Sequence, residues 1–448
     1  MSSRLIDRVR GAQARYRANE GATTDSEEFE RIKKQLHAEL IEALDFDQVV
    51  KTPRDELAAR LRNTLTEQVE TRALPLNRLE RERLVEEILD DILGLGPLET
   101  LLRDPDISDI LINGANDVYV EKKGQLQRYP LKFNDERHLM QIIDRIVSAV
   151  GRRIDETSPM VDARLQDGSR FNAIIPPVAL DGPCVSIRRF GTVPIMAEDL
   201  VVLGSCPQPV LDMLEAAVAS RLNIIISGGT GSGKTTLLNV LSAFIPEGER
   251  IVTIEDSAEL QLQQSHVVRL ETRPPNLEGR GEITQRDLVK NSLRMRPDRI
   301  ILGEIRSSEA IDMLQAMNTG HEGSMATVHA NTTRDALSRI ETMVGLGMAN
   351  VSDKHIRENI ARALDLVIQL GRLSDGSRRI LQVSEVTGIQ GSVITTQDVF
   401  VFEQTTIDSH GKVRGVFRAT GTRPRFADRF RAHGIDLPAD IFRFRMEV

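Results

Sequence analysis

A glycine-rich stretch in the middle of the chain combines residue types that together bind phosphate. It follows the spacing G-x-x-x-x-G-K-[ST]. Its residues are Gly228, Gly229, Thr230, Gly231, Ser232, Gly233, Lys234 and Thr235, and Thr236 follows them. Glycines let consecutive backbone N–H groups turn toward a di- or triphosphate, and a lysine adds a mobile positive charge beside the outer phosphates. The stretch therefore predicts a nucleotide site in which Lys234 contacts phosphate and the hydroxyl of Thr235 is a ligand for Mg²⁺.

The flanking residues favour this interpretation over a flexible glycine turn. Residues 222–227 form a nearly continuous apolar run, which is typical of a central parallel strand, and residues 236–241 have a helical pattern. A phosphate-binding loop needs this order, because the positive end of the following helix faces the anion.

Acids follow two later apolar runs, residues 251–254 and residues 299–303. They are Glu255, Asp256, Glu259 and Glu304. The carboxyl ends of parallel strands are where an open sheet binds its ligands. Hydrolysis of a nucleotide needs one acid near Mg²⁺ and a second that orients and deprotonates water, so the necessary groups are available. The alternative is that these acids cap the next helix, which applies more to Glu255 and Asp256 than to Glu304.

Residues 320–331 hold two of the eight histidines around another predicted strand. A zinc pair is disfavoured, because no third ligand is evident and positions 321 and 329 do not form a metal-binding face on a strand. We expect His329, with Asn331, to lie at the end of this strand and to contact the outermost phosphate. Structural histidines are the alternative.

Changes in sequence pattern divide the chain into five parts. Residues 1–26 are polar, which predicts a disordered arm, and residues 27–93 repeat apolar positions at three- and four-residue steps, which predicts a helical bundle. Residues 94–190 mix short strands with a helix, and residues 191–207 contain the Gly and Pro of a linker. Residues 208–448 alternate strands and helices. The fold class is therefore α/β, with a mostly parallel sheet in the last part.

The composition is that of a globular chain. Charged residues make up 28% and hydrophobic residues 40%, no apolar run reaches the ~18 residues of a membrane span, and no signal peptide is evident; we expect a cytosolic protein. The net charge of −8 and the 4% of aromatic residues disfavour a nucleic-acid coat. Only two cysteines are present, which excludes a four-cysteine zinc module. An acidic stretch (79–109) and a basic stretch (412–431) are either two docking faces or ordinary solvated surfaces.

Further motifs precede the glycine-rich stretch. They are Gly94-Leu95-Gly96-Pro97-Leu98, Ile107-Ser108-Asp109-Ile110, Ile112-Asn113-Gly114, Asp162-Ala163-Arg164-Leu165 and Asp167-Gly168-Ser169-Arg170. With the phosphate loop, the two acidic groups and the histidines, they make the chain resemble the secretion ATPase superfamily of type II secretion, type IV secretion and type IV pilus machines, from about residue 94 onward. The chain looks most similar to the CpaF-type ATPases of tight-adherence (Tad/Flp) pili.

The resemblance implies roles for the site residues. It makes Glu259 the catalytic base, Glu304 the Walker B acid and a metal ligand, and His329 the residue that senses nucleotide state. It also implies that arginines of the N-terminal domain reach the phosphate, since an arginine fork suits phosphate oxygens. The matching region contains Arg164, Arg170, Arg188 and Arg189, for which surface salt bridges are the alternative.

The resemblance also implies a fold and partners. The fold is a RecA-like P-loop ATPase core preceded by a smaller PAS-like α/β domain and the helical bundle. Members of the superfamily form homo-hexameric rings that bind ATP and Mg²⁺ and act from the cytoplasm, peripherally at the inner membrane, on integral platform proteins. Two features depart from the pattern: Ser257 stands where many relatives have proline, and a four-cysteine zinc insert is missing. The missing insert points away from the branches that carry one.

The expected function is ATP hydrolysis that powers assembly, with or without retraction, of a Tad/Flp pilus or a related secretion machine. The main alternative is a nucleic-acid translocase with the same core, which the basic stretch 412–431 favours and the net charge of −8 disfavours. A nucleotide-binding scaffold that hardly hydrolyses is a third. We expect no stable binding to nucleic acid.

Overall fold

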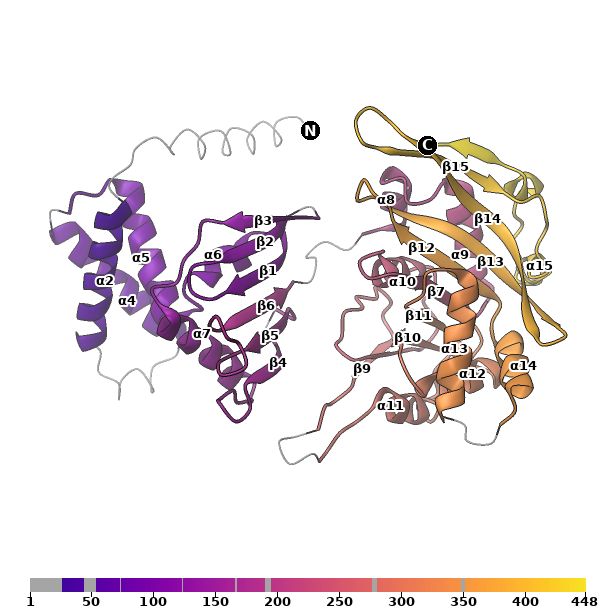
Figure 1. Ribbon diagram of the computed structural model, residues 1–448, viewed down its shortest axis with the longest axis horizontal. Coiled ribbons are helices and arrows are strands. Elements are labelled where there is room, and N and C mark those ends of the chain that lie inside the picture. The colour runs from indigo at the N-terminus through magenta and orange to yellow at the C-terminus, as the bar shows by residue number, and fades with distance from the viewer. Residues whose placement is uncertain are drawn as a thin grey trace. The chain divides into compact units, whose positions relative to one another are not determined.

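The computed structural model describes residues 26–43, 54–72, 74–122, 124–165, 167–189, 195–275, 280–347 and 351–448. The chain forms two compact units, divided between Gly191 and Thr192 (Figure 1). Each unit has its own hydrophobic core. The arm predicted over residues 1–26 lies outside the described residues as far as position 25.

Three helices fill the range predicted for the bundle. They are α2 (Ser26–Ala43), α4 (Arg54–Thr71) and α5 (Arg78–Leu93). Their periodic apolar residues meet in one cluster, which includes the buried side chains of Leu36, Leu65 and Ile88. Asn77 begins α5, because its side chain accepts the N–H of Glu80 at 3.0 Å while the Glu80 side chain accepts the N–H of Asn77 at 2.8 Å.

The rest of the N-terminal unit is an antiparallel sheet with a helix packed on one face. Its elements are α6 (Leu98–Arg103), β1 (Ile107–Asn113), β2 (Val118–Lys122), β3 (Gln125–Tyr129), α7 (Glu136–Ala149), β4 (Met160–Arg164), β5 (Arg170–Ile174) and β6 (Cys184–Arg188). The strand order is β3-β2-β1-β6-β5-β4, and every neighbouring pair is antiparallel. Phe171 and Ala173 of β5 share the core with Ile142 of α7. The alternate residues of β5, Arg170 and Asn172, therefore lie on the opposite face.

The C-terminal unit is built on one mixed sheet. Its elements are α8 (Ala197–Val202), α9 (Gln208–Ala219), β7 (Ile224–Gly228), α10 (Lys234–Ser242), β8 (Ile251–Glu255), β9 (Val267–Glu271), α11 (Gln285–Ser292), β10 (Arg299–Ile305), α12 (Glu309–Asn318), β11 (Met325–Val328), α13 (Thr333–Gly347), α14 (Asp353–Ala363), β12 (Leu366–Arg372), β13 (Arg378–Gln390), β14 (Val393–Ile407), β15 (Val413–Ala419), α15 (Ala427–Ala432), a 3-10 turn (Ala439–Phe442) and β16 (Arg445–Glu447). Among the described residues the strand order is β16-β15-β14-β13-β12-β7-β11-β10-β8-β9. The strands from β12 to β9 in this order pair in parallel.

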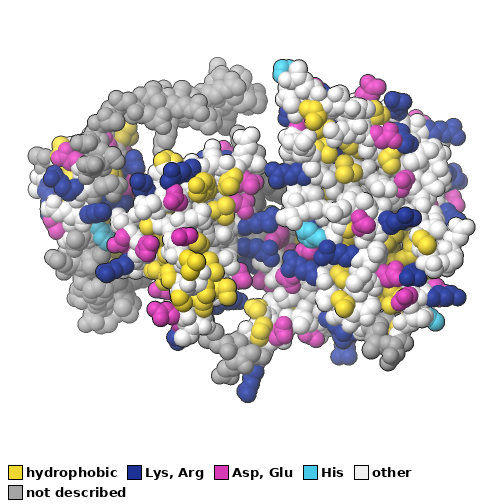
Figure 2. Space-filling model, in the orientation of Figure 1, with side chains coloured by type: hydrophobic (Ala, Val, Ile, Leu, Met, Phe, Trp, Pro, Cys, Tyr) yellow, Lys and Arg dark blue, Asp and Glu magenta, His cyan; other side chains and the backbone are white. Residues whose placement is uncertain are grey.

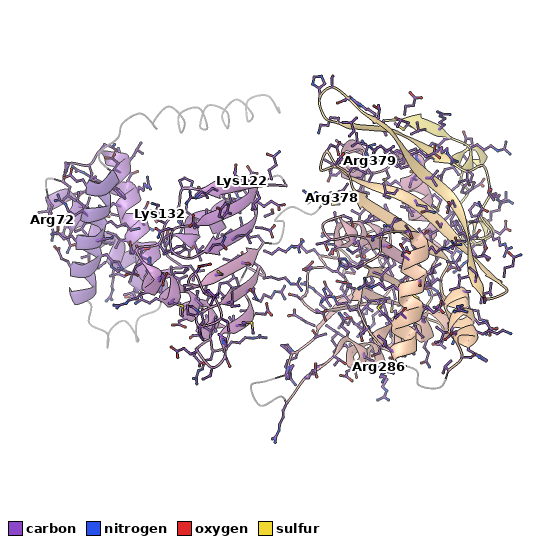
Figure 3. The ribbon with its side chains drawn as sticks, viewed as in Figure 1. Arg72, Lys122, Lys132, Arg286, Arg378 and Arg379 are labelled. Carbon is purple, nitrogen blue, oxygen red and sulfur yellow. The ribbon has the colours of Figure 1, made fainter. Side chains whose placement is uncertain are left out.

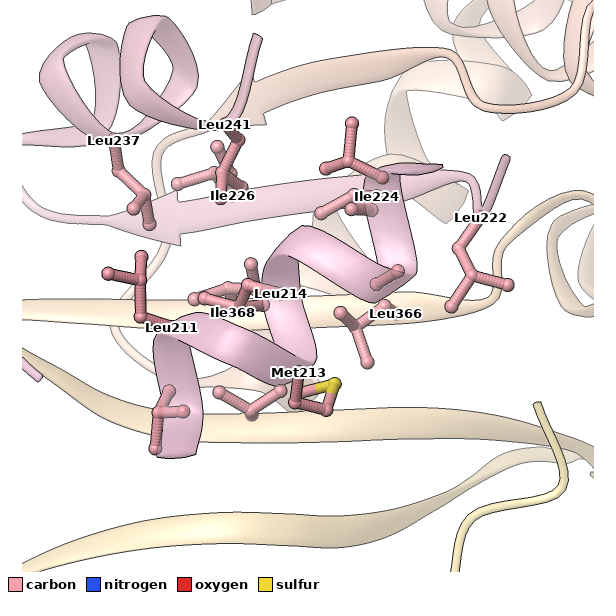
Figure 4. Close-up of a cluster of buried hydrophobic side chains, with 14 of the residues drawn as sticks. Leu211, Met213, Leu214, Leu222, Ile224, Ile226, Leu237, Leu241, Leu366 and Ile368 are labelled. Carbon is pink, nitrogen blue, oxygen red and sulfur yellow. The ribbon is translucent and has the colours of Figure 1, made fainter. Parts of the chain in front are cut away.

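Strand β7 lies inside the parallel part and is buried along its whole length. Ile224 and Ile226 belong to one core with Leu214 of α9 and Leu237 of α10 (Figure 4). Ile225, which points to the other face, belongs to a second core that includes residues of α12, α13 and α14. Burial of both faces explains why this strand is a continuous apolar run in the sequence.

The sheet continues beyond the part that the sequence predicted. Strands β13, β14, β15 and β16 are added to β12 in antiparallel order. The sheet is therefore parallel on one side of β12 and antiparallel on the other, and the predicted parallel arrangement describes only the first of these parts. The pattern did not indicate these strands, because β13 and β14 are long and mix buried residues with partly exposed polar ones.

The range predicted for the linker, residues 191–207, overlaps the C-terminal unit. Residues 195–207 belong to the C-terminal unit, since they include α8 and place Leu200 and Cys206 in its core. The sequence did not indicate this, because the two buried positions, Leu200 and Cys206, do not recur at a helical period. Within the part of the chain that the structure describes, no helix has the length and apolar character that crossing a membrane requires.

Candidate nucleotide site

The phosphate loop joins the buried strand β7 to helix α10. Gly231 and Gly233 have φ angles of 70° and 95°, which L side chains rarely adopt, so both positions require glycine. A Cβ atom at Gly228 would lie 2.4 Å from Oγ of Ser232 and 2.9 Å from the carbonyl oxygen of Leu370. The tight turn leads directly into the first turn of α10, whose N–H groups have no acceptors within the helix. This end of α10 is therefore suited to an anion.

A chain of polar contacts connects the loop lysine with the acid of β10. Nζ of Lys234 lies 3.0 Å from the carbonyl oxygen of Gly229 and 3.5 Å from Nδ1 of His329. Nε2 of His329 lies 3.3 Å from Oε1 of Glu304. The structure thus brings together three predicted site residues, although the first and the last to appear in the sequence are separated by 95 positions.

The surroundings of His329 favour its neutral form. Burial, followed by the positive charge of Lys234, lowers the pKa of His329 from its ordinary value. An ammonium group can only donate, so Nδ1 of His329 accepts from Lys234 and the ring proton is on Nε2. This tautomer, assigned from its partners, donates to Glu304. The histidine therefore connects the position of the lysine with the orientation of the acid.

Arg306 completes the group, and the sequence analysis did not single it out. Its guanidinium donates to Oε2 of Glu304 at 2.8 Å and to Oδ2 of Asp256 at 2.9 Å. The hydrogen bond to Glu304, together with the charges of Asp256 and Glu259, raises the pKa of Arg306. Both predicted catalytic acids, Glu259 and Glu304, thus stabilise the positive charge of Arg306. The available signal was the position of Arg306, two residues after a predicted site acid.

Glu255 has a different position from the one predicted. It is only 3% exposed, and its Oε2 accepts the N–H groups of Glu259 at 2.7 Å and Leu260 at 2.9 Å. Burial raises the pKa of Glu255 to about 7. We therefore assign Glu255 to the loop that carries Glu259 and not to direct contact with a nucleotide.

Two arginines, at the end of β12 and at the start of β13, lie beside the phosphate loop, which the sequence did not indicate. Arg378 lies at the start of β13 (Figure 3). Its Nε donates to the carbonyl oxygen of Gly231 at 2.8 Å. A Cβ at Gly231 would lie 3.8 Å from a guanidinium nitrogen of Arg372. Strand β12 pairs with β7 as far as Gly228, which brings these residues alongside the loop. The contact of Arg378 spans 147 positions, so no local pattern reveals it.

The oxygen donors of the site fit Mg²⁺. Gly229 and Thr230 lie within the loop, and Thr235 and Thr236 lie in the first turn of α10. The hydroxyl of Thr235 and the carboxylate of Glu304 are hard oxygen ligands, which Mg²⁺ combines with phosphate oxygens and water. The Glu304 side chain is 19% exposed and so remains accessible. Among the described residues, no three His, Cys, Asp or Glu side chains form a group that could hold a metal.

The N-terminal unit places three of the four predicted arginines in one row. Arg164, Arg170 and Arg188 are direct cross-strand neighbours on β4, β5 and β6, so their side chains leave the same face of the sheet. Like charges opposite each other destabilise a sheet, and an anion between them relieves that cost. Arg189 differs: its guanidinium donates to carbonyl oxygens of α6 and of the start of β1, so we assign it to the fold of the unit.

Comparison with known proteins decides the family. The profile of the type II/IV secretion system protein family matches residues 91–415. The chain belongs to this family. One relative, the putative conjugal transfer protein Rv3659c of Mycobacterium tuberculosis, is 36% identical over 309 residues, which are 68% of this chain and 87% of the relative. The type IV secretion system protein VirB11 of Bartonella henselae is 30% identical over 328 residues, which are 64% of this chain and 91% of the relative.

Solved structures of similar chains also exist. The crystal structure of the VirB11 ATPase from the Brucella suis type IV secretion system, in complex with sulphate, has 27% sequence identity and a TM-score of 0.36, and it covers 64% of this chain and 92% of that one. In this type II/IV secretion system protein, the matched range runs from the last turn of α5 into β15 and contains the phosphate loop, both acidic groups and His329. Helices α2 and α4 precede it.

Proposed function

We propose that this type II/IV secretion system protein is an ATPase that powers assembly of a Tad/Flp pilus or a related secretion machine. One observation carries the proposal. Lys234 of the phosphate loop, His329 and Glu304 form a continuous chain of contacts. Arg306 extends this chain to Asp256, in the acidic loop that follows β8 and carries Glu259. The family match supports coupling to a secretion machine, and so do the relatives named for conjugal transfer and type IV secretion.

Each residue has one task in the proposed reaction. The loop N–H groups and Lys234 bind and orient the polyphosphate, while Thr235 and Glu304 hold Mg²⁺, which supplies neutralisation of the phosphate charge. Glu259 orients the attacking water and accepts its proton. His329 accepts from Lys234 and donates to Glu304, and so fixes the positions of these two side chains relative to each other.

The finer parts of the proposal concern assembly. The protein acts as a cytoplasmic homo-hexamer, peripheral at the inner membrane, on integral platform proteins of the pilus machine. Arg164, Arg170 and Arg188 contact a phosphate in this assembly. Two things support this: the resemblance to CpaF-type ATPases, and the cross-strand row, in which three positive charges share one face of the N-terminal sheet.

The test is ATP turnover by the purified protein and by two site variants. Lys234→Ala removes the phosphate contact and Glu304→Gln removes the charge of the metal-binding acid, so we expect each to lower kcat by on the order of a hundredfold or more. The control is Glu215→Gln, which changes an exposed acid of α9 in the same unit. Turnover that survives both site variants would exclude this site as the place of hydrolysis.

A nucleic-acid translocase is the second candidate, favoured by the basic stretch 412–431. Four arginines of this stretch form ion pairs within the C-terminal unit, which lowers the positive field that nucleic acid would meet. The pairs are Arg414–Asp408, Arg418–Glu403, Arg423–Asp428 and Arg429–Asp365. Figure 2 shows basic and acidic side chains interspersed on the visible face. Stimulation of turnover by DNA that fades with added salt would favour this candidate.

A further inference from the structure

The loop that carries Glu259 is held in an unusual way. The backbone N–H groups of four consecutive residues, 258 to 261, are each accepted by a side chain. Glu271 accepts from Ala258 at 3.1 Å. Glu255 accepts from the next two residues, and Oδ1 of Asn239 accepts from Gln261 at 2.9 Å. Loop N–H groups are commonly satisfied by backbone or water, so this set requires a reason.

The three acceptor residues come from three elements, of which β8 and α10 also carry or follow parts of the nucleotide site. Glu255 and Glu271 are register partners at the ends of the parallel strands β8 and β9. Asn239 lies on α10, the helix that follows the phosphate loop. It is four positions after Thr235, so both side chains lie on the same face of α10, one turn apart. The contact of Asn239 therefore joins the helix of the phosphate loop to the loop of the catalytic acid.

A second anchor follows on the same side of α10. Nε2 of Gln264, in the segment between β8 and β9, donates to the carbonyl oxygens of Ser242, the last residue of α10, and of Ile245, three residues beyond it. The buried Gln264 and the Asn239 bond thus attach the loop to α10 at two levels. The position of Glu259 is therefore defined from the helix side as well as from the strand side.

We propose that Asn239 and Glu255 are positioning residues, which hold the 258–261 backbone so that Glu259 is placed relative to the phosphate loop. Asn239 makes this placement depend on α10, so a ligand that orders the start of α10 also orders the catalytic acid. This inference rests on the proposed function, because it takes Glu259 as the base of hydrolysis. Neither residue touches the reacting atoms.

The test compares two substitutions of one side chain. Asn239→Leu keeps the approximate size and favours a helix but removes the acceptor, whereas Asn239→Asp keeps an oxygen at the same reach. We expect Asn239→Leu to lower kcat about tenfold with KM for ATP unchanged within about twofold, because one net hydrogen bond of the loop is lost. Asn239→Asp recovers kcat to within about threefold of the wild-type value. Asn291→Leu, at an exposed asparagine of α11, is the matched control.

Hydrogen exchange supplies a readout that does not depend on turnover. In Asn239→Leu, we expect amide exchange of Glu259 and Leu260 to rise about tenfold, although their own acceptor is intact, while strand β8 stays protected. Unchanged exchange at these two amides would overturn the inference, and so would a normal kcat in Asn239→Leu.

The two proposals fail in different ways. If the wild-type protein shows no turnover that depends on Lys234, the proposed function is wrong and this inference is overturned with it. If turnover depends on Lys234 but Asn239→Leu and Asn239→Asp have the same kcat, only the positioning role is wrong.

Discussion

Glu255 shows what burial does to a single carboxyl group. Its pKa is raised to about 7 by burial, so the folded protein binds this proton more tightly than the unfolded chain does. The resulting stabilisation is present below the ordinary pKa, near 4.5, and is lost as pH rises through about 7. The pH range over which this stabilisation is lost therefore runs from the ordinary pKa, 4.5, to the pKa in the folded protein, about 7.

Glu255→Gln removes this titration while keeping an oxygen that accepts the loop N–H groups. We expect the wild-type protein to lose about 2–3 kcal/mol of unfolding free energy between pH 5 and pH 8 relative to this variant. Urea unfolding at a series of pH values measures the difference. Glu215→Gln, at an exposed position, should follow the wild-type profile; parallel profiles for Glu255→Gln would show that the buried group does not titrate there.

The site residues that the sequence revealed are those with a local motif. Lys234 and Glu304 follow from the phosphate-loop spacing and from an apolar run that ends in an acid, as described above. Asn239 and Arg378 have no such signal, because the atoms they contact lie 22 and 147 positions away. Glu255 could not be placed from the sequence, since an acid at a strand end can turn toward a ligand or toward its own loop.

Among the elements, β10 depends on a buried arginine at its first residue. Arg299 is fully buried and donates to Glu249 at 2.6 and 3.1 Å and to the carbonyl oxygens of Val218 and Gly323. It therefore ties the start of β10 to the end of α9 and to the loop before β11. Arg221 also pairs with Glu249, at 3.3 Å, but its side chain is 35% exposed.

Removing the buried arginine leaves acceptors without a donor. We expect Arg299→Met to lower the free energy of unfolding by about 3 kcal/mol, because breaking the buried ion pair leaves the carboxylate of Glu249 without its main partner. Arg221→Met removes the exposed partner of the same acid and should cost less than about 1 kcal/mol. Chemical denaturation measures both, and equal losses would contradict the assignment of the buried pair as the main one.

The elements that the sequence predicted are those with one strong period. Residues 222–227 and 299–303 are mostly apolar because both faces of the strands β7 and β10, which lie there, are covered. Strands β13 to β16 were not predicted, because their alternation is interrupted by polar residues and by register shifts within the pairs. A ladder of this kind depends on neighbours that only the folded chain provides.

At the scale of the whole molecule, the acidic stretch (79–109) and the basic stretch (412–431) each have several of their charges in ion pairs in the folded protein. Acids of the range 79–109 pair with arginines of the same unit, as the basic stretch does in the other unit. The acidic-stretch pairs are Arg78–Glu82, Arg83–Glu87 and Arg103–Asp90. Counting charge along the chain cannot show partners from other turns and elements. The structure thus favours ordinary solvated surfaces over two docking faces.

The arginine row of the N-terminal unit is different, because its members face like charges. Arg170 lies between Arg164 and Arg188 in the register of β4, β5 and β6. Like charges directly opposite each other are unfavourable in a sheet. If the row contacts phosphate, as we propose, its loss should affect hydrolysis and not folding.

Arg170→Ala separates these effects. We expect turnover to fall at least about tenfold, because a bidentate contact to the developing phosphate charge is lost. Nucleotide affinity should stay within about threefold, since the phosphate loop supplies most of the binding, and the melting temperature should stay equal or rise because repulsion is relieved. Arg128→Ala is the control, since Arg128 is an exposed arginine on the edge strand β3 that pairs with Asp117. Full turnover in Arg170→Ala would remove the row from the mechanism, whereas a lower melting temperature would assign it to the fold.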